Sequence, residues 1–353
     1  MLREKLKITS FELIIKQYQW YSLPIAGWVL KYQHKILYKV FIKKFNRKVE
    51  LFLFILVSIS DMNAFTIKDL ENLSGIKAHT IRIWEQRYNF LKPQRTTTNI
   101  RYYTNDELKT VLNIALLNKY GFKISHIDKM RPQEIREKIL SLGDARAVQE
   151  RIMNDLVQEM VDLEMEKFEK ILTTYIASKG IERTVIQIIF PFMEKIGILW
   201  QTGHINPAQE HLVTNIIRQK LIVGIETTVS PVKVNKTFLL FLPEGEHHEL
   251  GLLFMYYLLK SRGANVIYLG ANVPVKDAEH VIRLKKPDIV FVHLTATSTH
   301  FNFEKFLTNV ENRFLGTNTV VSGLLTQHYR KKVPDSVQFK KSLSEVMEFL
   351  SAL

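Results

Sequence analysis

Two adjacent histidines occur in the stretch PEGEHHELG at residues 243–251, directly after an apolar run. A neutral imidazole is a common metal ligand, and an acidic residue that binds its other ring nitrogen raises its basicity. Glu246 stands two positions before His248 and can have that role, while Gly251 allows a following helix to start close to a bound group. This spacing alone leaves a surface histidine as an equal alternative, but the position directly after the apolar run favours a ligand histidine at position 248. The alternative is a solvated loop histidine, which is the more typical interpretation for His247.

The sequence from residue 236 onward predicts the sheet that would hold this stretch. Apolar strands separated by amphipathic helices are typical of a parallel sheet that is buried on both faces. Ligands bind such sheets outside the carboxyl ends of the strands, which is where residues 243–251 would lie. The expected strands are residues 237–242, 264–270, 288–294 and 318–323, and the expected helices are residues 249–262 and 275–284.

The part of the chain before this sheet is predicted to be mainly helical. Two short helices joined at Gly75 and followed by a β-hairpin indicate a winged helix-turn-helix. Apolar side chains at helical spacing then predict a four-helix bundle. The expected elements are helices at 64–76, 77–88 and 105–121, a hairpin at 90–104, a linker from Pro132 that merges into helices over 133–150, the bundle at 147–228 and a second linker at 231–235.

Composition limits the function further. The chain has 353 residues, 46% of them apolar, which is enough for several domains. It has no cysteine, which excludes disulfides, thiolate zinc sites, iron–sulfur clusters and cysteine nucleophiles, and which fits a reducing compartment such as the cytoplasm. The net charge is +14, and residues 62–130 carry 11 Lys and Arg against 6 Asp and Glu. This local excess favours a nucleic-acid partner for that segment.

Residues 1–61 differ from the rest. Residues 1–60 carry 11 Lys and Arg against 3 Asp and Glu, and no acidic residue lies between Glu12 and Glu50. The apolar run at 51–60 is shorter than the roughly 20 residues of a spanning helix, and no small-residue cleavage site follows it. The favoured interpretation is that Met62 is the true start and that residues 1–61 are a mis-assigned or disordered extension. A membrane-associated leader is the alternative.

Residues 65–130 resemble the MerR family of winged-helix DNA-binding domains. The resemblance implies that the second helix enters the major groove of double-stranded DNA and that the hairpin reaches phosphates. For Trp84, Tyr88 and Tyr103 the alternative role is that of core aromatics. The matching positions are Thr80, Ile81, Arg82, Glu85, Leu91, Pro93, Arg95, Arg101, Tyr102, Tyr103, Thr104 and Asp106. The side chains expected to bind DNA are His79, Thr80, Arg82, Arg95, Arg101 and Tyr102.

Residues 236–353 resemble the Rossmann-like, flavodoxin-like cobalamin-binding domain, whose motif is Asp, any residue, His, two residues and Gly. The resemblance implies that His248 is the axial ligand to cobalt, with Glu246 and Gly251 in the other two motif positions. Two further elements line the slot for the nucleotide tail in that family, and this chain departs from both. Ser-x-Leu falls on His293, Leu294 and Thr295, and Gly-Gly falls on Ser322 and Gly323. His293 could donate to the tail, or the slot could be partly blocked.

Residues 200–211 are similar to the cap of the light-responsive, MerR-type cobalamin regulators of the CarH/LitR type. Trp200, Glu210 and His211 match the motif that faces the upper side of cobalamin, while Leu212 replaces its last histidine. A large ring can cover an adenosyl group, and Glu and His can bind its ribose and base. In light-sensing members a histidine follows the tryptophan, but here that residue is Gln201. A bis-histidine photoproduct would therefore need another residue, such as His204 or His211.

The resemblances together predict a multidomain α plus α/β protein. Its domains would be residues 62–132, 147–228 and 236–353. Its function would be that of a cobalamin-responsive transcriptional regulator whose ligand state controls assembly and operator binding, with a light response left open. It would be no enzyme. The expected partners are double-stranded operator DNA, adenosylcobalamin or alternatively methylcobalamin, and further copies of the chain in a dimer or tetramer, without a membrane. The alternatives are a MerR-type regulator that has lost cobalamin or senses another small molecule, and a corrinoid methyl carrier. The expected cofactor-binding residues are Trp200, Glu210, His211, Glu246, His248, Gly251, His293, Thr295 and Gly323.

Overall fold

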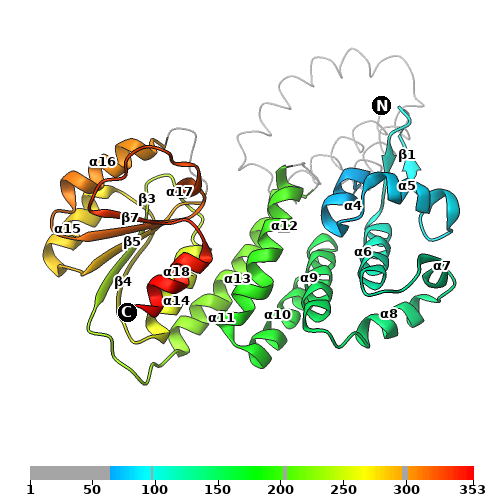
Figure 1. Cartoon of the computed structure of the whole chain (residues 1–353), viewed down its shortest axis with the longest axis horizontal. Helices are drawn as coiled ribbons and strands as arrows, with labels where there is room; N and C mark the ends of the chain where they lie inside the picture. Colours follow the sequence, from blue (N-terminus) through cyan, green and yellow to red (C-terminus); the bar gives the residue numbers. More distant parts are fainter. Residues whose placement is uncertain (1–63, 97, 202–204, 296–300) are drawn as a thin grey trace, which may run out of the picture. The chain divides into compact units, whose positions relative to one another are not determined.

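A computed structural model describes residues 64–96, 98–201, 205–295 and 301–353 (Figure 1). The chain divides into two units, residues 1–61 and 62–353, and the described residues belong to the second. The predictions about residues 1–61 and Met62 therefore lie outside the described residues. Within the described ranges, no helix has both the length and the apolar character of a membrane span.

The first described elements form the predicted winged helix-turn-helix. Thr66 caps the first helix, since its hydroxyl accepts from the N–H of Asp69, whose carboxylate accepts the Thr66 N–H at 2.7 Å. Leu70, Ile81 and Trp84 are buried in a shared core. Trp84 is therefore a core aromatic. The elements are α4 (Ile67–Ser74), α5 (Ala78–Arg87), β1 (Gln94–Arg95), β2 (Arg101–Tyr102), α6 (Asn105–Lys119) and α7 (Ile124–Ile127), with β1 antiparallel to β2.

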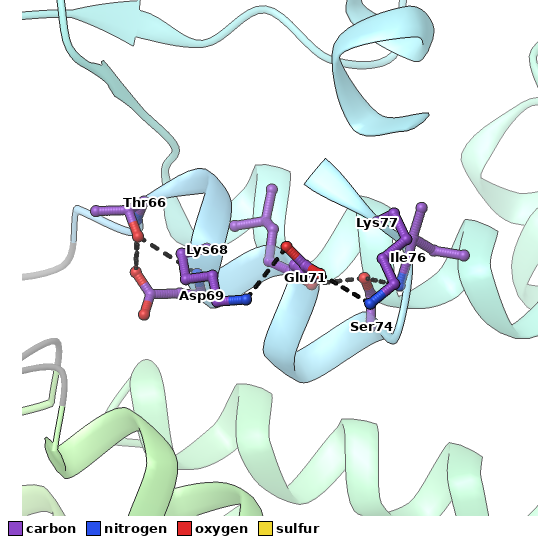
Figure 2. Close-up of polar contacts among 8 residues, drawn as sticks. Thr66, Lys68, Asp69, Glu71, Ser74, Ile76 and Lys77 are labelled. Carbon is purple, nitrogen blue, oxygen red and sulfur yellow. Dashed lines mark hydrogen bonds and ion pairs between the residues drawn. The ribbon is translucent and has the colours of Figure 1, made fainter. Parts of the chain in front are cut away.

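A short turn joins α4 to α5 and fixes where the second helix begins (Figure 2). Gly75 ends α4 with a φ of 73°, a left-handed conformation that glycine adopts without strain. The Ser74 hydroxyl accepts from the N–H of Ile76 at 3.1 Å. An ion pair of 3.3 Å between Lys77 and Glu71 then ties the start of α5 to α4.

The stretch after residue 132, predicted as a linker that merges into helices, is helical from its start, because α8 spans Pro132–Leu140. Proline is favourable in the first turn of a helix, where its missing N–H leaves no bond unmade. The Glu134 carboxylate accepts the N–H of Arg131 at 2.7 Å, and Ile139 is buried. The charged side chains of this stretch thus form the solvated face of an amphipathic helix.

The predicted all-helical segment follows. Its core includes Leu156, Phe168, Phe192 and Val213, one from each of the four helical arms. A π-helical turn interrupts the third arm just before Phe190, and such turns often occur near binding sites. The elements are α9 (Ala145–Val161), α10 (Met165–Lys179), α11 (Ile181–Thr184), the π-helical turn η2 (Val185–Ile189), α12 (Phe190–Gln201) and α13 (Pro207–Thr227).

The last region is a five-stranded parallel sheet with the order β4-β3-β5-β6-β7. This is the doubly wound, flavodoxin-like order. The four predicted strands are confirmed, and β7 was not predicted. The strands are β3 (Thr237–Pro243), β4 (Asn265–Val273), β5 (Ile289–His293), β6 (Asn318–Ser322) and β7 (Val337–Lys340). The helices are α14 (Leu250–Ser261), α15 (Val275–Lys285), α16 (Phe303–Arg313), α17 (Leu324–His328) and α18 (Leu343–Ser351).

Alternate side chains of the buried strands face opposite sides of the sheet. Leu240 and Phe291 belong to the core shared with α14 and α18. Phe241 and Val292 belong to a second core, shared with α15 and α16. Figure 1 shows these two helix pairs on the two faces of the sheet. With both faces covered, the carboxyl edge of the sheet is left for binding.

Candidate functional site

The loop after β3 holds the predicted histidine against a buried carboxylate. Glu246 has no exposed surface. Its Oε1 accepts from the His248 backbone N–H at 2.9 Å and lies 2.6 Å from Nδ1 of the His248 ring. Its Oε2 accepts the N–H of Thr295 at 2.9 Å. These three contacts fix the carboxylate between two loops of the sheet edge.

The electrostatics of this pair suit a ligand histidine. Burial by itself would raise the pKa of Glu246, but hydrogen bonds from the His248 ring and backbone, and from Thr295, hold that pKa below its ordinary value. The ionised carboxylate thus accepts a hydrogen bond from Nδ1–H of His248, which leaves Nε2 as the ring nitrogen suited to bind a metal. The His248 side chain is 57% exposed, so its ring is accessible.

A second cluster next to His248 was not predicted. Glu249 accepts from Arg218 Nε at 2.9 Å and from the Tyr268 hydroxyl at 2.6 Å. Arg218 lies on α13 of the helical bundle and Tyr268 on β4, so Glu249 joins both to the start of α14. Burial and the neighbouring Glu249 raise the pKa of Tyr268, which therefore stays a hydrogen-bond donor. This cluster fixes the loop that carries His248.

A cavity of about 220 Å³ lies beside this loop. Its walls come from α14, the ends of β5 and β6, and the start of α18, and Phe190 of α12 contributes from the bundle. Thr295 links the cavity to the histidine, since it lines the cavity and donates its N–H to Glu246. Gly323 lies on the wall with a φ of 99°, and a Cβ there would be 2.2 Å from the carbonyl oxygen of Leu294. Only glycine fits at that position.

His293 lies in this cavity against Gly251. A Cβ built on Gly251 would be 2.4 Å from both Cδ2 and Nε2 of the His293 ring. The opposite ring nitrogen, Nδ1, lies 2.8 Å from the hydroxyl of the buried Ser322. Burial lowers the pKa of His293 to about 4, because desolvation outweighs the attraction of Glu246. The ring is therefore neutral near pH 7.

The three residues predicted to cap the ligand come from two helices of the bundle. Trp200 lies at the end of α12 and is 57% exposed. Glu210 lies in the first turn of α13, where it accepts from Thr214 at 2.9 Å, and His211 lies 3.4 Å from its other oxygen. His204 lies outside the described residues.

The residues predicted to bind DNA are placed on one helix and on the hairpin. His79 and Arg82 are exposed on α5, and Thr80 is half-buried. Arg95 is exposed on β1, where it bonds the side chain of Asn99 at 2.7 Å. Arg101 and Tyr102 are half-buried on β2. Each position remains a prediction for DNA contact.

Glu85 has a structural role in this region. It accepts from Arg101 Nε at 3.0 Å and from the hydroxyl of the fully buried Tyr103. Arg101 is therefore held against α5 and does not extend freely from the hairpin. Gln86, which the sequence analysis did not single out, is exposed on the same face of α5 as His79 and Arg82 and is a further candidate for DNA contact. The helical spacing of these positions is the signal that could have found it.

Three segments of the chain match known families. Residues 65–134 match the MerR HTH family regulatory protein. Residues 152–223 and residues 237–338 match two families that are each described as a B12 binding domain. The matches cover the winged helix-turn-helix, the helical bundle and the sheet.

Two relatives from Myxococcus xanthus extend over most of the chain. The HTH-type transcriptional repressor CarH is 26% identical over 252 residues, which are 70% of this chain and 84% of the relative. The HTH-type transcriptional repressor CarA is 26% identical over 285 residues, which are 80% of this chain and 94% of the relative. Among solved structures, the Methanosarcina barkeri monomethylamine corrinoid protein has a TM-score of 0.42 at 11% identity and covers 58% of this chain and 100% of its own.

The fold and these matches define a class of protein in which a winged helix-turn-helix of the MerR type, here residues 65–134 and called the DNA reader below, is joined to a B12-binding region. The chain has a MerR-type helix-turn-helix followed by B12-binding domains and is a cobalamin-linked transcriptional regulator related to CarH and CarA.

Proposed function

We propose that His248 binds the cobalt of cobalamin as the lower axial ligand, and that the bound ligand changes the assembly of the regulator and its binding to operator DNA. The observation that carries this proposal is the contact of 2.6 Å between Nδ1 of His248 and the buried Glu246. A single imidazole with an acidic partner suits a metal whose equatorial ligands come from a macrocycle.

The residues at the sheet edge fit this group. Cobalamin supplies a cobalt centre that accepts an imidazole on its lower face and carries an exchangeable ligand on its upper face. His248 would bind the metal, Glu246 would orient the ring, and Thr295 would hold Glu246 in place. Trp200, Glu210 and His211 would contact the upper ligand, for which adenosyl is our expectation and methyl the alternative.

The DNA reader explains why assembly matters. A single winged helix-turn-helix reaches few base pairs, so useful affinity requires two or more readers on repeated half-sites. A ligand that stabilises a dimer or tetramer would raise the local concentration of readers and so control operator binding by mass action. In this scheme the chain performs no catalysis, and the corrinoid is a signal.

The test is an absorption spectrum of the full chain purified with adenosylcobalamin in darkness. We expect the wild type to retain the corrinoid and His248→Ala to bind it at least about tenfold more weakly. His247→Ala is the matched control, because His247 is exposed in the same loop. Equal binding by wild type and His248→Ala would refute axial ligation by this residue.

The same samples test assembly and light. Size-exclusion chromatography and DNA gel shifts, with a fragment selected from random sequence by the wild type, should change together when the corrinoid is added. Spectra before and after green light test a light response in a chain with Gln201 after Trp200. An unchanged assembly state and unchanged DNA affinity would refute ligand control.

A second candidate function is regulation by another small molecule. The position of the His293 ring against Gly251, inside the cavity, favours it, because the ring takes up space there. Absence of binding to any cobalamin form by correctly folded protein would support this second function over the first.

A further inference from the structure

We propose that His293 excludes the nucleotide tail of complete cobalamin from the cavity beside His248, so that the chain favours corrinoids without that tail. The inference rests on the proposed ligation by His248. It concerns a side chain of this protein that departs from the family pattern, and it specifies which corrinoids the site selects.

The first step is chemical. The nucleotide base of free cobalamin can itself occupy the lower axial position. When His248 takes that position, the base and the chain that carries it must go elsewhere. The cavity is the adjoining space, because Thr295 both lines it and holds the carboxylate that orients His248.

The size of the cavity limits what it can hold. The cavity has a volume of about 220 Å³, whereas pockets that enclose whole organic ligands usually measure roughly 300–1,000 Å³. The ring of His293 lies directly against the backbone of Gly251, since a Cβ there would be 2.4 Å from two ring atoms. A smaller side chain at position 293 would open the wall between α14 and β5.

The His293 ring is held in place by a hydrogen bond as well as by packing. Nδ1 of His293 lies 2.8 Å from the hydroxyl of Ser322, which is itself 2% exposed. Moving the ring aside for a nucleotide would break this bond and leave a buried hydroxyl without that partner. The ring is therefore wedged between Ser322 and Gly251, and tail entry has to displace it.

The experiment compares two ligands, adenosylcobalamin and adenosylcobinamide, which lacks the nucleotide. Equilibrium dialysis in darkness gives the dissociation constant of each with the full chain. We expect the wild type to bind adenosylcobinamide at least as tightly as adenosylcobalamin. His293→Ser should tighten adenosylcobalamin binding by about tenfold, or about 1.4 kcal/mol, and change adenosylcobinamide binding by less than about twofold.

Two further variants control the result. His293→Asn removes the imidazole but can still bond Ser322. It should therefore shift the preference toward adenosylcobalamin even if His293→Ser loses the Ser322 contact and folds poorly. His280→Ser makes the same exchange at an exposed position on α15 and should leave both constants unchanged.

The outcomes separate the two proposals. If the wild type prefers adenosylcobalamin by about tenfold or more, or if neither variant at position 293 changes the ratio of the constants, the inference about His293 is overturned while ligation by His248 stands. If neither ligand binds to the wild type, both proposals fail.

Discussion

The two regions of this chain that contain the predicted binding residues hold those side chains in opposite ways. On the DNA reader, His79 and Arg82 are exposed on α5, whose opposite face is packed in the core. At the sheet edge, the histidine depends on Glu246, which has no exposed surface and accepts from two separate loops. An exposed side chain can be removed without harm to the fold, whereas a buried carboxylate serves stability and binding together.

The same contrast exists inside the DNA reader. Glu85 is mostly buried and fixes Arg101 and Tyr103, so it belongs to the scaffold even though it lies on the second helix. Residues predicted to bind DNA, such as His79 and Arg82, thus lie on the same helix α5 as the scaffold residue Glu85. At the sheet edge the predicted binding residues and the scaffold residues coincide, which makes that site more sensitive to substitution.

The largest expected effect comes from Glu246→Gln. The amide replaces one acceptor oxygen by a donor, so either the His248 or the Thr295 N–H faces another donor. We expect a stability loss of about 1–3 kcal/mol and a cobalamin affinity lower by about 10–100-fold. Urea unfolding and equilibrium dialysis measure the two effects.

The matched control is Glu244→Gln, because Glu244 is exposed in the same loop. It should change stability by less than about 0.5 kcal/mol. If both variants behave alike, burial of Glu246 is not what links stability to binding, and the comparison between the two regions breaks down.

The second prediction concerns Arg82→Ala. Since Arg82 is exposed, its loss should leave stability within about 0.5 kcal/mol. Affinity for a fragment selected by the wild type should fall by about 1–3 kcal/mol, with weaker discrimination at one base position. Fluorescence anisotropy against a set of single-base variants measures both.

Lys138→Ala on α8 removes one exposed positive charge as well and is the control. A loss of DNA affinity that is equal for the two variants, and equal for every base sequence, would mean that Arg82 contributes only general charge.

Local patterns made much of the fold predictable. The apolar runs predicted four of the five strands, and Glu246 and His248 were singled out because they follow the first strand and, with Gly251, match the motif of the cobalamin-binding domain. Strand β7, Val337–Lys340, was missed because it has only four residues and two of them are half-buried. The charged stretch after Pro132 was taken for a linker because the burial of Ile139 depends on its tertiary partners.

The missed parts of the site are contacts between distant segments. Glu249 meets Arg218 across 31 positions and Tyr268 across 19. No motif of fixed spacing contains these three residues. The packing of His293 on Gly251 is of the same kind, since each lies in a recognisable motif but their contact arises only when β5 and α14 are assembled.

A third prediction tests that contact through stability. Gly251→Ala places a methyl group about where the His293 ring lies, so we expect a loss of about 1–3 kcal/mol in the ligand-free wild type. In a His293→Ser background the loss should largely disappear, because the ring that the methyl group would meet is gone. Alanine is also more favourable than glycine in a helix. A double-mutant cycle from urea unfolding gives the coupling energy.

Gly197→Ala on α12 is the control, since no atom of the described residues lies within 4 Å of a Cβ built there. It should be neutral or stabilising in both backgrounds. An equal loss of stability for Gly251→Ala with histidine and with serine at position 293 would show that the ring moves away easily. It would contradict the conclusion that the sheet edge is the more rigid of the two regions.

The smallest expected effect is a dependence of stability on pH. Burial lowers the pKa of His293 from 6.5 to about 4 in the folded chain. The unfolded chain therefore binds a proton between these values while the folded chain does not, so stability is complete above pH 6.5 and falls as the pH drops toward 4. Between pH 6.5 and 5.5 the wild type should lose about 1 kcal/mol more than His293→Ser.

Urea unfolding at these two pH values checks the prediction, with His280→Ser as the exposed control that keeps the wild-type dependence. If His293→Ser and wild type lose the same stability, the ring is solvated in the folded chain. The cavity would then be open to water, and the sheet edge would hold His293 no more firmly than α5 holds His79.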